Sequence, residues 1–157
     1  MRLDRAWIAA HIPHHGAMCL LDEVIEWSVA GIRCRSGSHR APDNPLRAHG
    51  RLGAACGIEY AAQAMAVDGA MRAAQAAGAA TTRSGLLASV RSVTMSVARL
   101  DDINGDIYAS ASRIHGDRAM ILYDFAISDT TRLLLSGRAT IAFDATSRAP
   151  TSERAPS

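Results

Sequence analysis

The C-terminal half of the chain shows the alternation of apolar and polar residues that is typical of half-buried strands. Over residues 132–143, Leu133, Leu135 and Ile141 lie on one face, and polar residues such as Arg138 lie on the other. Similar patterns predict strands over residues 86–100, 107–114 and 120–128, with turns at 101–106, 116–117 and 129–131. These segments predict an antiparallel meander with one buried face and one wet face.

The N-terminal half predicts a short helix and a hairpin. A helix is expected over residues 4–11, ending before Pro13, and a turn follows at residues 14–16. Strands are predicted over residues 20–28 and 32–37, with Gly31 at the turn between them. Residues 38–50 contain the turn-forming residues of a loop.

A long run of alanine with no proline predicts one helix over residues 53–77. This helix is apolar on nearly every face, so we expect a sheet to wrap around it, and its many small residues allow a close approach. Residues 78–84 then break the helix.

These elements together predict an α+β domain in which a curled antiparallel sheet wraps around one long central helix, the hotdog fold. We assign residues 1–145 to this domain and expect the Ser, Thr, Pro and Arg-rich tail at 146–157 to be disordered. The exposed edge of the sheet would need a cover, commonly a second copy of the chain.

Composition removes several functions. All 17 basic residues among the 157 are arginine, so lysine Schiff-base chemistry is excluded. Aromatic residues make up 4%, and 17 basic residues nearly balance 15 acidic ones, which disfavours nucleic acid as a partner.

Nothing in the sequence predicts export or membrane insertion. Residues 1–13 lack the apolar core of a signal peptide, and the most apolar stretch, 52–67, is interrupted by Glu59 and Gln63, so we expect a cytoplasmic protein. The cysteines, Cys19, Cys34 and Cys56, form no CxxC pair and are expected to be free thiols.

Glu59 is the acidic residue that stands out, because it lies within the apolar helix and Gln63 follows one turn later on the same face. A buried carboxylate needs a partner or a proton. The pattern is equally consistent with Glu59 and Gln63 lining a narrow exposed strip.

Histidines offer several further candidates. His39 lies at the start of the loop before the helix, where a catalytic histidine is often placed. By position alone, His49 and His115 are equally good candidates for a catalytic histidine. His11, His14 and His15 resemble a metal cluster, but Pro13 disturbs their register and no carboxylate completes a site, so no metal is expected. The alternative to a catalytic role is that a loop histidine such as His39 is an ordinary solvated residue.

The sequence resembles the β-hydroxyacyl-acyl-carrier-protein dehydratases of the hotdog superfamily over nearly the whole ordered chain. The matching segments are Ile-Pro-His-His at 12–15 with Leu-Leu-Asp-Glu-Val at 20–24, Ser-His-Arg-Ala-Pro-Asp-Asn-Pro-Leu at 38–46, Ile-Glu-Tyr-Ala-Ala-Gln at 58–63, and the strands after Leu86.

The chain departs from the family pattern in its loop. One extra residue precedes Asn44, and residues 46–56 form a longer connection in which Gly-Arg-Leu-Gly at 50–53 replaces Met-Pro-Gly. In this respect the chain is similar to a divergent bacterial subgroup of predicted dehydratases, some of them associated with aryl-polyene-type pathways. The insertion leaves His49 as a rival to His39.

The resemblance implies dehydration of a 3-hydroxyacyl thioester, on acyl carrier protein or coenzyme A, with no metal or redox cofactor. His39 would be the general base and Glu59, kept protonated by apolar surroundings, the general acid. Gln63 and Asn44 would orient these groups or the substrate, and backbone N–H groups from Gly53 to Gly57 would polarise the thioester carbonyl.

The family also implies partners. Base and acid come from different subunits, so a homodimer or a heterodimer with another hotdog chain would be obligatory, and the acyl chain would lie in a tunnel beside the helix. Arg40, Arg47 and Arg51 flank the loop and would attract an acidic carrier protein or its phosphopantetheine, unless they form an ordinary solvated surface.

Two other functions fit the same fold. One is a thioesterase, in which Glu59 or Asp43 activates water against the thioester carbonyl. The other is a catalytically idle subunit that completes the site of another hotdog protein, for which the altered 46–56 loop gives a reason.

Overall fold

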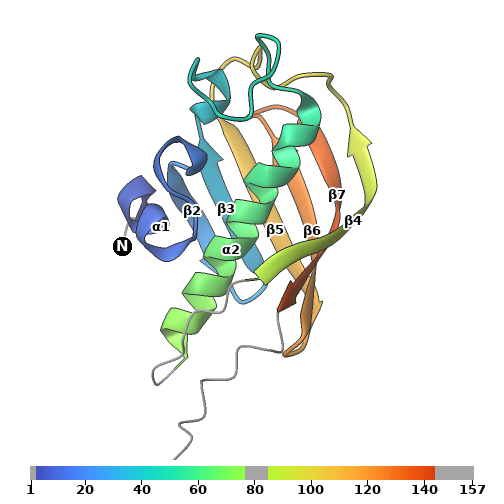
Figure 1. The fold of residues 1–157 in the computed structure, drawn as a ribbon. Helices are drawn as coiled ribbons and strands as arrows, with labels where there is room; N and C mark the ends of the chain where they lie inside the picture. The colour runs from blue at the N-terminus through green and yellow to red at the C-terminus, as the bar shows by residue number, and fades with distance from the viewer. Residues whose placement is uncertain (1–2, 77–84, 144–157) are drawn as a thin grey trace, which may run out of the picture.

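The computed structural model describes residues 3–76 and 85–143. Within this part, one antiparallel sheet curls around a long helix that crosses its concave face (Figure 1). In the order in which they lie across the sheet, the strands are β1 (Leu3–Asp4), β2 (Glu23–Ser28), β3 (Gly31–Ser36), β5 (Ile107–Gly116), β6 (Met120–Ser128), β7 (Leu133–Phe143) and β4 (Gly85–Met95). The helical segments are α1 (Arg5–His11), α2 (Gly57–Gln75) and the 3-10 turns η1 (Gly16–Met18), η2 (Ser38–Arg40) and η3 (Ala54–Cys56).

The central helix is the feature that defines the architecture. It was expected over residues 53–77, and it is observed as the turn η3 followed by α2, which ends at Gln75. Most of its contacts with the sheet are made to β3, β5 and β6. The predicted α+β hotdog arrangement is confirmed, whereas the predicted break at 78–84 and the tail at 146–157 lie outside the described residues.

The first long strand begins later than its apolar pattern predicted. Leu20 and Leu21 are fully buried, but β2 starts only at Glu23. The backbone N–H of Leu20 donates to the side chain of Gln63, and its carbonyl accepts from Ser36 and Ser38. These side chains take the place of a strand partner, so burial at this point does not mean a strand.

The edge strand β4 ends earlier than predicted because its continuation turns to support the start of the central helix. The predicted strand ran to Leu100, but β4 stops at Met95. Beyond it, Ala98 accepts from the N–H of Ala54, and the N–H of Leu100 donates to Leu52. These bonds tie the segment before α2 to the chain that leaves the sheet.

Close packing between helix and sheet explains the glycine at the start of α2. A Cβ built at Gly57 would lie 2.7 Å from Cδ2 of Leu135 and 3.2 Å from Cγ1 of Ile127. Both neighbours are fully buried. Only a residue without a side chain therefore lets this turn approach the sheet so closely.

Asp68 fixes the middle of α2 against the sheet. Its fully buried carboxylate accepts from Trp27 Nε1 at 2.9 Å, Tyr123 Oη at 2.6 Å and Arg72 Nε at 2.9 Å. Burial and the neighbouring Asp68 carboxylate raise the pKa of Tyr123, which keeps its hydroxyl a donor. A buried carboxylate with several donors is compensated and sets the register of the helix.

Among the strands of residues 3–76 and 85–143, β4 is an edge strand with apolar surface that no further strand covers. Most of its residues are exposed, including Leu86 at 71% and the apolar side chains of Leu87 and Met95. β1 forms the opposite edge of the sheet and is only two residues long. The free side of β4 is therefore the edge on which a second chain would pair with exposed backbone and pack on apolar side chains.

The cysteines are free thiols, as predicted, with Cys19 and Cys34 buried and Cys56 partly buried. Burial raises the pKa of the Cys34 thiol to about 12, so it stays protonated. None of the helices in the described ranges is long and apolar enough to cross a membrane.

Candidate active site

His39 lies in η2, the turn that follows β3, and its side chain is fully buried. Nε2 lies 3.1 Å from the carbonyl oxygen of Ile103, which can only accept, so the ring proton is on Nε2. Nδ1 then carries a lone pair, and it has no hydrogen-bond partner among the described residues. Burial lowers the pKa of His39, so the imidazole is neutral and is able to accept a proton near neutral pH.

The loop that carries His39 is fastened to α2 by Tyr60 and Asn44. The Tyr60 hydroxyl lies 2.7 Å from Ser38 Oγ and accepts from Asn44 Nδ2 at 3.0 Å. The same amide donates to the Ser38 carbonyl, and its oxygen accepts from the N–H of Leu46. Asn44, predicted to orient substrate, thus directs its side-chain amide into the loop itself.

Glu59 lies in the first turn of α2 and is less enclosed than the sequence suggested. Its side chain is 34% exposed, which corrects the expectation of a carboxyl group embedded in apolar surroundings and agrees with the alternative of an exposed strip. Oε1 accepts from Gln63 Nε2 at 3.2 Å and lies 3.1 Å from His14 Nε2. The carboxyl group is thus held by two polar side chains.

Gln63 is the fixed point of this group. Its side chain is fully buried; Oε1 accepts from the N–H of Leu20, and Nε2 donates to the carbonyl of Met18 and to Glu59. The segment before β2 therefore anchors Gln63, and Gln63 anchors Glu59.

A cavity of about 580 Å³ extends from Glu59 along the exposed face of α2. Its helix side is made of small residues at helical spacing: Ala62, Ala66, Gly69, Ala70 and Ala73. Apolar side chains from the sheet form the opposite wall, namely Leu86, Leu87, Ile121, Ile141 and Phe143. The small helix residues leave the room that an apolar ligand would occupy.

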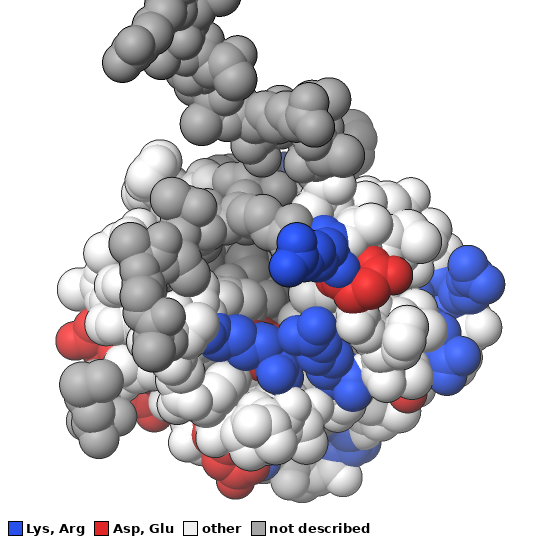
Figure 2. Space-filling view, turned by 90° about the horizontal axis from the view of Figure 1, so that it is seen from below, with Lys and Arg blue, Asp and Glu red and all other residues white. Residues whose placement is uncertain are grey.

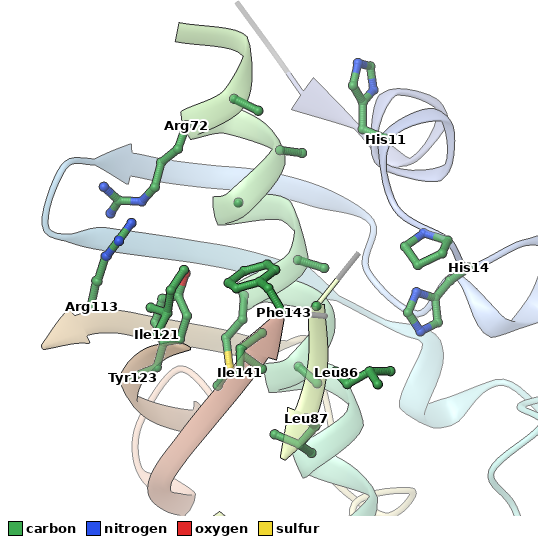
Figure 3. Close-up of a pocket in the computed structure, with 18 of the residues that line it drawn as sticks. His11, His14, Arg72, Leu86, Leu87, Arg113, Ile121, Tyr123, Ile141 and Phe143 are labelled. Atoms are coloured by element: carbon green, nitrogen blue, oxygen red, sulfur yellow. The ribbon is translucent and has the colours of Figure 1, made fainter. Parts of the chain in front are cut away.

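The two ends of the cavity differ in chemistry. His11 and His14 lie on one side and Arg72 and Arg113 on the other (Figure 3). Seen from below, several basic side chains gather near the middle of the face (Figure 2). One end thus offers a carboxyl group with histidines, and the other offers guanidinium groups.

A single chain does not bring His39 and Glu59 together. His39 is not among the residues that line the cavity, and within residues 3–76 and 85–143 no hydrogen bond or ion pair joins the two side chains. The rival His49 lies on an exposed turn between Ala48 and Arg51, where its φ is 53°. It is thus not enclosed in any site of one chain.

Fewer free backbone N–H groups than expected remain at the start of α2 to bind a substrate. The N–H groups of Ala54, Cys56 and Gly57 already donate to backbone carbonyls. This corrects the expectation that the N–H groups between Gly53 and Gly57 as a set are available to polarise a thioester carbonyl. Gly57 is required instead for the packing of the helix on the sheet.

The three arginines near the loop have different surroundings. Arg47 donates to the carbonyls of Ala41 and Arg40 at 2.9 and 3.3 Å, so its guanidinium holds the loop together. Arg40 is exposed and lies 3.4 Å from Asp106, and Arg51 is exposed. Of the three predicted docking residues, Arg40 and Arg51 present their side chains to solvent.

The N-terminal histidines do not converge. His11 Nδ1 donates to the carbonyl of Trp7 at 2.7 Å and its ring stacks on the Trp7 indole, whereas His14 faces Glu59 and His15 is exposed. In the part of the chain that the structure describes, no three His, Cys, Asp or Glu side chains are grouped to hold a metal ion.

Sequence reasoning assigned no function to two residues of this region. His14 was considered only within a motif and in a histidine cluster that was not expected to bind a metal, and Tyr60 only as the neighbour of Glu59. A signal for His14 was present, because Pro13 ends the segment after α1 and prevents the next residues from continuing the helix. Its partner, however, is 45 residues away in the sequence, and only folding brings them together.

Comparison with known proteins gives a consistent picture. The chain matches the ApeP-like family, described as ApeP dehydratase, over residues 6–149. A search of curated proteins gave no match.

Among solved structures, the dehydratase heterocomplex ApeI:P from Xenorhabdus doucetiae is similar, with a TM-score of 0.77 and 22% identity over 88% of this chain and 91% of that chain. Thioesterase superfamily member 2 of zebra fish has a TM-score of 0.60 and 15% identity over 88% of this chain and 94% of its own. A hypothetical thioesterase with coenzyme A from Streptococcus pneumoniae has a TM-score of 0.52 and 14% identity over 78% and 84%. These likenesses show the hotdog fold.

Proposed function

Because the chain belongs to the ApeP-like dehydratase family, we propose that it dehydrates 3-hydroxyacyl thioesters to trans-2-enoyl thioesters. The substrate would be carried on acyl carrier protein in fatty-acid or polyene biosynthesis. The observation that carries the proposal is Glu59, held by Gln63 at one end of an apolar cavity that follows α2.

The reaction needs a group that protonates the departing hydroxyl. Glu59 is placed for this, because it lines the cavity and its carboxyl group is held by Gln63. As the C3–O bond breaks, the carboxyl proton of Glu59 passes to the departing hydroxyl, which leaves as water.

The reaction also needs a base for the C2 proton. His39 has the properties of one, because its pKa is lowered by burial and Nδ1 carries an unused lone pair. Electrons of the C2–H bond form the new C2–C3 double bond, and the proton taken up by the imidazole later returns to Glu59, directly or through solvent.

A second chain would bring together the acid and the base, which are separate in one chain. His39 and Glu59 are separate within one chain, and among the described residues β4 is a long edge strand with exposed apolar side chains. We place the partner on this edge. Because His39 is fully buried in the single chain, association would also have to open the turn η2, so that Glu59 of one protomer meets His39 of the partner subunit.

The shape of the cavity supports an acyl thioester as substrate. Its walls are apolar side chains and small helix residues, and its volume of about 580 Å³ is that of a typical small-molecule site. Arg40 and Arg51, which are exposed beside the loop, would meet the acidic carrier.

Complementation tests both the reaction and the shared site. His39→Ala and Glu59→Gln should each lower turnover of 3-hydroxyacyl-carrier protein at least about a hundredfold with the fold intact. Mixing and reassociating the two inactive variants should restore about a quarter of the wild-type activity, because half of the dimers carry one intact site. If the mixture stays inactive although the chains exchange, the shared site is wrong.

Substrate comparison separates the proposal from thioester hydrolysis. The protein is incubated with 3-hydroxyacyl and saturated acyl thioesters, and enoyl product and free thiol are measured together. Enoyl product without thiol from the 3-hydroxyacyl thioester supports dehydration. Thiol release from both substrates without enoyl product would establish a thioesterase instead.

A second candidate function is a subunit that completes the site of another hotdog dehydratase. Its basis is that His39 is fully buried and away from the cavity in the single chain. The similar structure from Xenorhabdus doucetiae is a heterocomplex, which also favours this assignment. The pure chain would then be inactive, and a hotdog chain from the same organism would restore turnover that depends on Glu59 but not on His39.

A further inference from the structure

We propose that His14 is a positioning residue for Glu59: together with Gln63 it occupies Oε1, so that Oε2 is the oxygen that exchanges a proton with the substrate. The assignment rests on the proposed function of Glu59 as the acid. It concerns three side chains from two distant parts of the chain, one before β2 and two on α2.

The orientation of Gln63 is forced by the backbone around it. The N–H of Leu20 can only donate, so it faces Oε1 at 2.9 Å, and the carbonyl of Met18 can only accept, so it faces Nε2 at 2.8 Å. The second hydrogen of that NH₂ group points to Oε1 of Glu59. Because Gln63 is fully buried, this donor is fixed.

His14 also lies close to this carboxyl oxygen. Its Nε2 lies 3.1 Å from Oε1 of Glu59. Two atoms this close that both offered lone pairs would repel each other, so one of the two carries a proton, and Oε1 already accepts one from Gln63. We therefore place the proton on Nε2 of His14.

The other nitrogen of His14 supports this tautomer. Nδ1 is buried and has no hydrogen-bond partner among the described residues. A proton on Nδ1 would be a buried donor without an acceptor, which costs more than an unused lone pair on a weak acceptor. The tautomer with its proton on Nε2 is the form that the surroundings favour.

Two donors on one carboxyl oxygen have a chemical consequence. An oxygen that accepts two N–H groups is a poor place for an acidic proton, so the proton that Glu59 transfers belongs on Oε2. His14 and Gln63 thereby also fix the plane of the carboxyl group. Proton transfer is sensitive to such orientation, so the effect should be on kcat.

The remaining polar groups around the cavity leave this role to His14. His11 also lines the cavity, but its Nδ1 is bound to the carbonyl of Trp7. Arg72 lies about 20 Å from Glu59 along the helix axis, so it belongs to the other end of the cavity, and Arg113 lies on the same side as Arg72 (Figure 3).

Kinetics of four proteins tests the role. His14→Ala should lower kcat about tenfold or more and change KM less than threefold, because residues other than His14 form the apolar walls that would bind the acyl chain. His14→Gln, whose amide nitrogen can reach the position of Nε2, should recover part of kcat. His15→Ala, the exposed neighbour, should behave as wild type. Equal kcat in His14→Ala and wild type, with the fold confirmed by thermal unfolding, would overturn the proposal.

A spectroscopic arm does not depend on turnover. Long-range ¹H–¹⁵N correlation of the histidine side chains should show His14 protonated on Nε2 and not on Nδ1, and Glu59→Ala should change this tautomer or its chemical shifts. A His14 ring protonated on Nδ1, or one indifferent to Glu59→Ala, overturns the assignment. If the wild-type protein fails to dehydrate any 3-hydroxyacyl thioester, the proposed function fails, and this spectrum alone still decides whether His14 holds Glu59.

Discussion

The side-chain amide of Asn44 donates to the hydroxyl of Tyr60 across 3.0 Å, and this bond joins the loop that carries His39 to the turn of α2 that carries Glu59. Tyr60 follows Glu59 directly and is fully buried. Burial raises the pKa of Tyr60, so its hydroxyl keeps its proton. The loop that carries one candidate reacting group is therefore joined by a buried polar contact to the helix turn that carries the other, although the two groups do not contact each other.

Replacing Tyr60 by phenylalanine should loosen this connection. The change leaves a buried N–H of Asn44 without its acceptor and removes the contact with Ser38, so we expect a loss of about 1–3 kcal/mol in the free energy of unfolding. We also expect kcat/KM to fall about tenfold because the loop is less well positioned. Urea unfolding and initial rates measure both effects. Tyr108→Phe, at a half-buried strand position, is the control and should change neither.

Two glycines of α2 should respond in opposite ways to alanine. At Gly57 a Cβ would lie 2.7 Å from Leu135, so the variant should lose about 1–3 kcal/mol of stability through overpacking. At Gly69 no atom lies within 4 Å of the added Cβ, so the better helix propensity of alanine should raise stability by up to about 1 kcal/mol. Chemical denaturation measures both. Equal effects at the two positions would contradict the packing described for Gly57.

Stability should depend on pH through His39. Its pKa lies below the ordinary 6.5 because of burial, so the unfolded chain binds more protons than the folded chain near and below that pH. The contribution of His39 to stability is therefore complete above 6.5 and is lost as the pH falls through 6.5 toward the folded pKa.

His39→Asn should weaken this dependence. Thermal or urea unfolding between about pH 7.5 and pH 5 measures it, and the variant should lose less stability on acidification than wild type. His49→Asn is a matched control, because His49 is exposed and asparagine tolerates its positive φ. If the free energy of unfolding of His39→Asn falls with decreasing pH as steeply as that of the wild type, the imidazole is not protected from protonation in the folded chain.

Filling the cavity should shorten the acyl chains that the protein accepts. Ala66 lines the cavity from the middle of α2, and a phenylalanine there would occupy the space beyond the reacting end. Ala66→Phe should lower kcat/KM at least about tenfold for long-chain substrates and much less for short ones. Ala66→Ser, similar in size to the native residue, is the control. A chain-length profile unaltered in Ala66→Phe would place the acyl chain elsewhere.

A charge on the exposed edge strand should weaken assembly. Leu86 in β4 is 71% exposed in the single chain, and Leu86→Arg would put a cation into the apolar edge where we place the partner. Light scattering coupled to gel filtration should show a shift toward monomer. Val29→Arg, at a position that is 78% exposed in the β2–β3 turn, should leave assembly unchanged. If both variants had the same oligomeric state, β4 would not be part of the interface.

The sequence by itself determined the fold class and the order of its elements. The alternation over 132–143 predicted β7, and the alanine-rich stretch predicted α2, because strand and helix periods are local properties of the chain. The position of Glu59 and Gln63 on one helical face followed from their spacing of four residues. The resemblance to a dehydratase family, confirmed by the match over residues 6–149, needed only the order of motifs along the chain.

Only the tertiary structure decided which groups meet. His14 and Glu59, Tyr60 and Asn44, and His39 and Ile103 are pairs far apart in sequence, and their contacts depend on how α2, η2 and the loops pack. Burial is decided in the same way, since His39 is enclosed and Glu59 is partly exposed although the apolar pattern suggested an enclosed carboxyl group. Local sequence sets the period of each element, whereas desolvation and side-chain partners depend on surfaces that exist only once the elements have packed together.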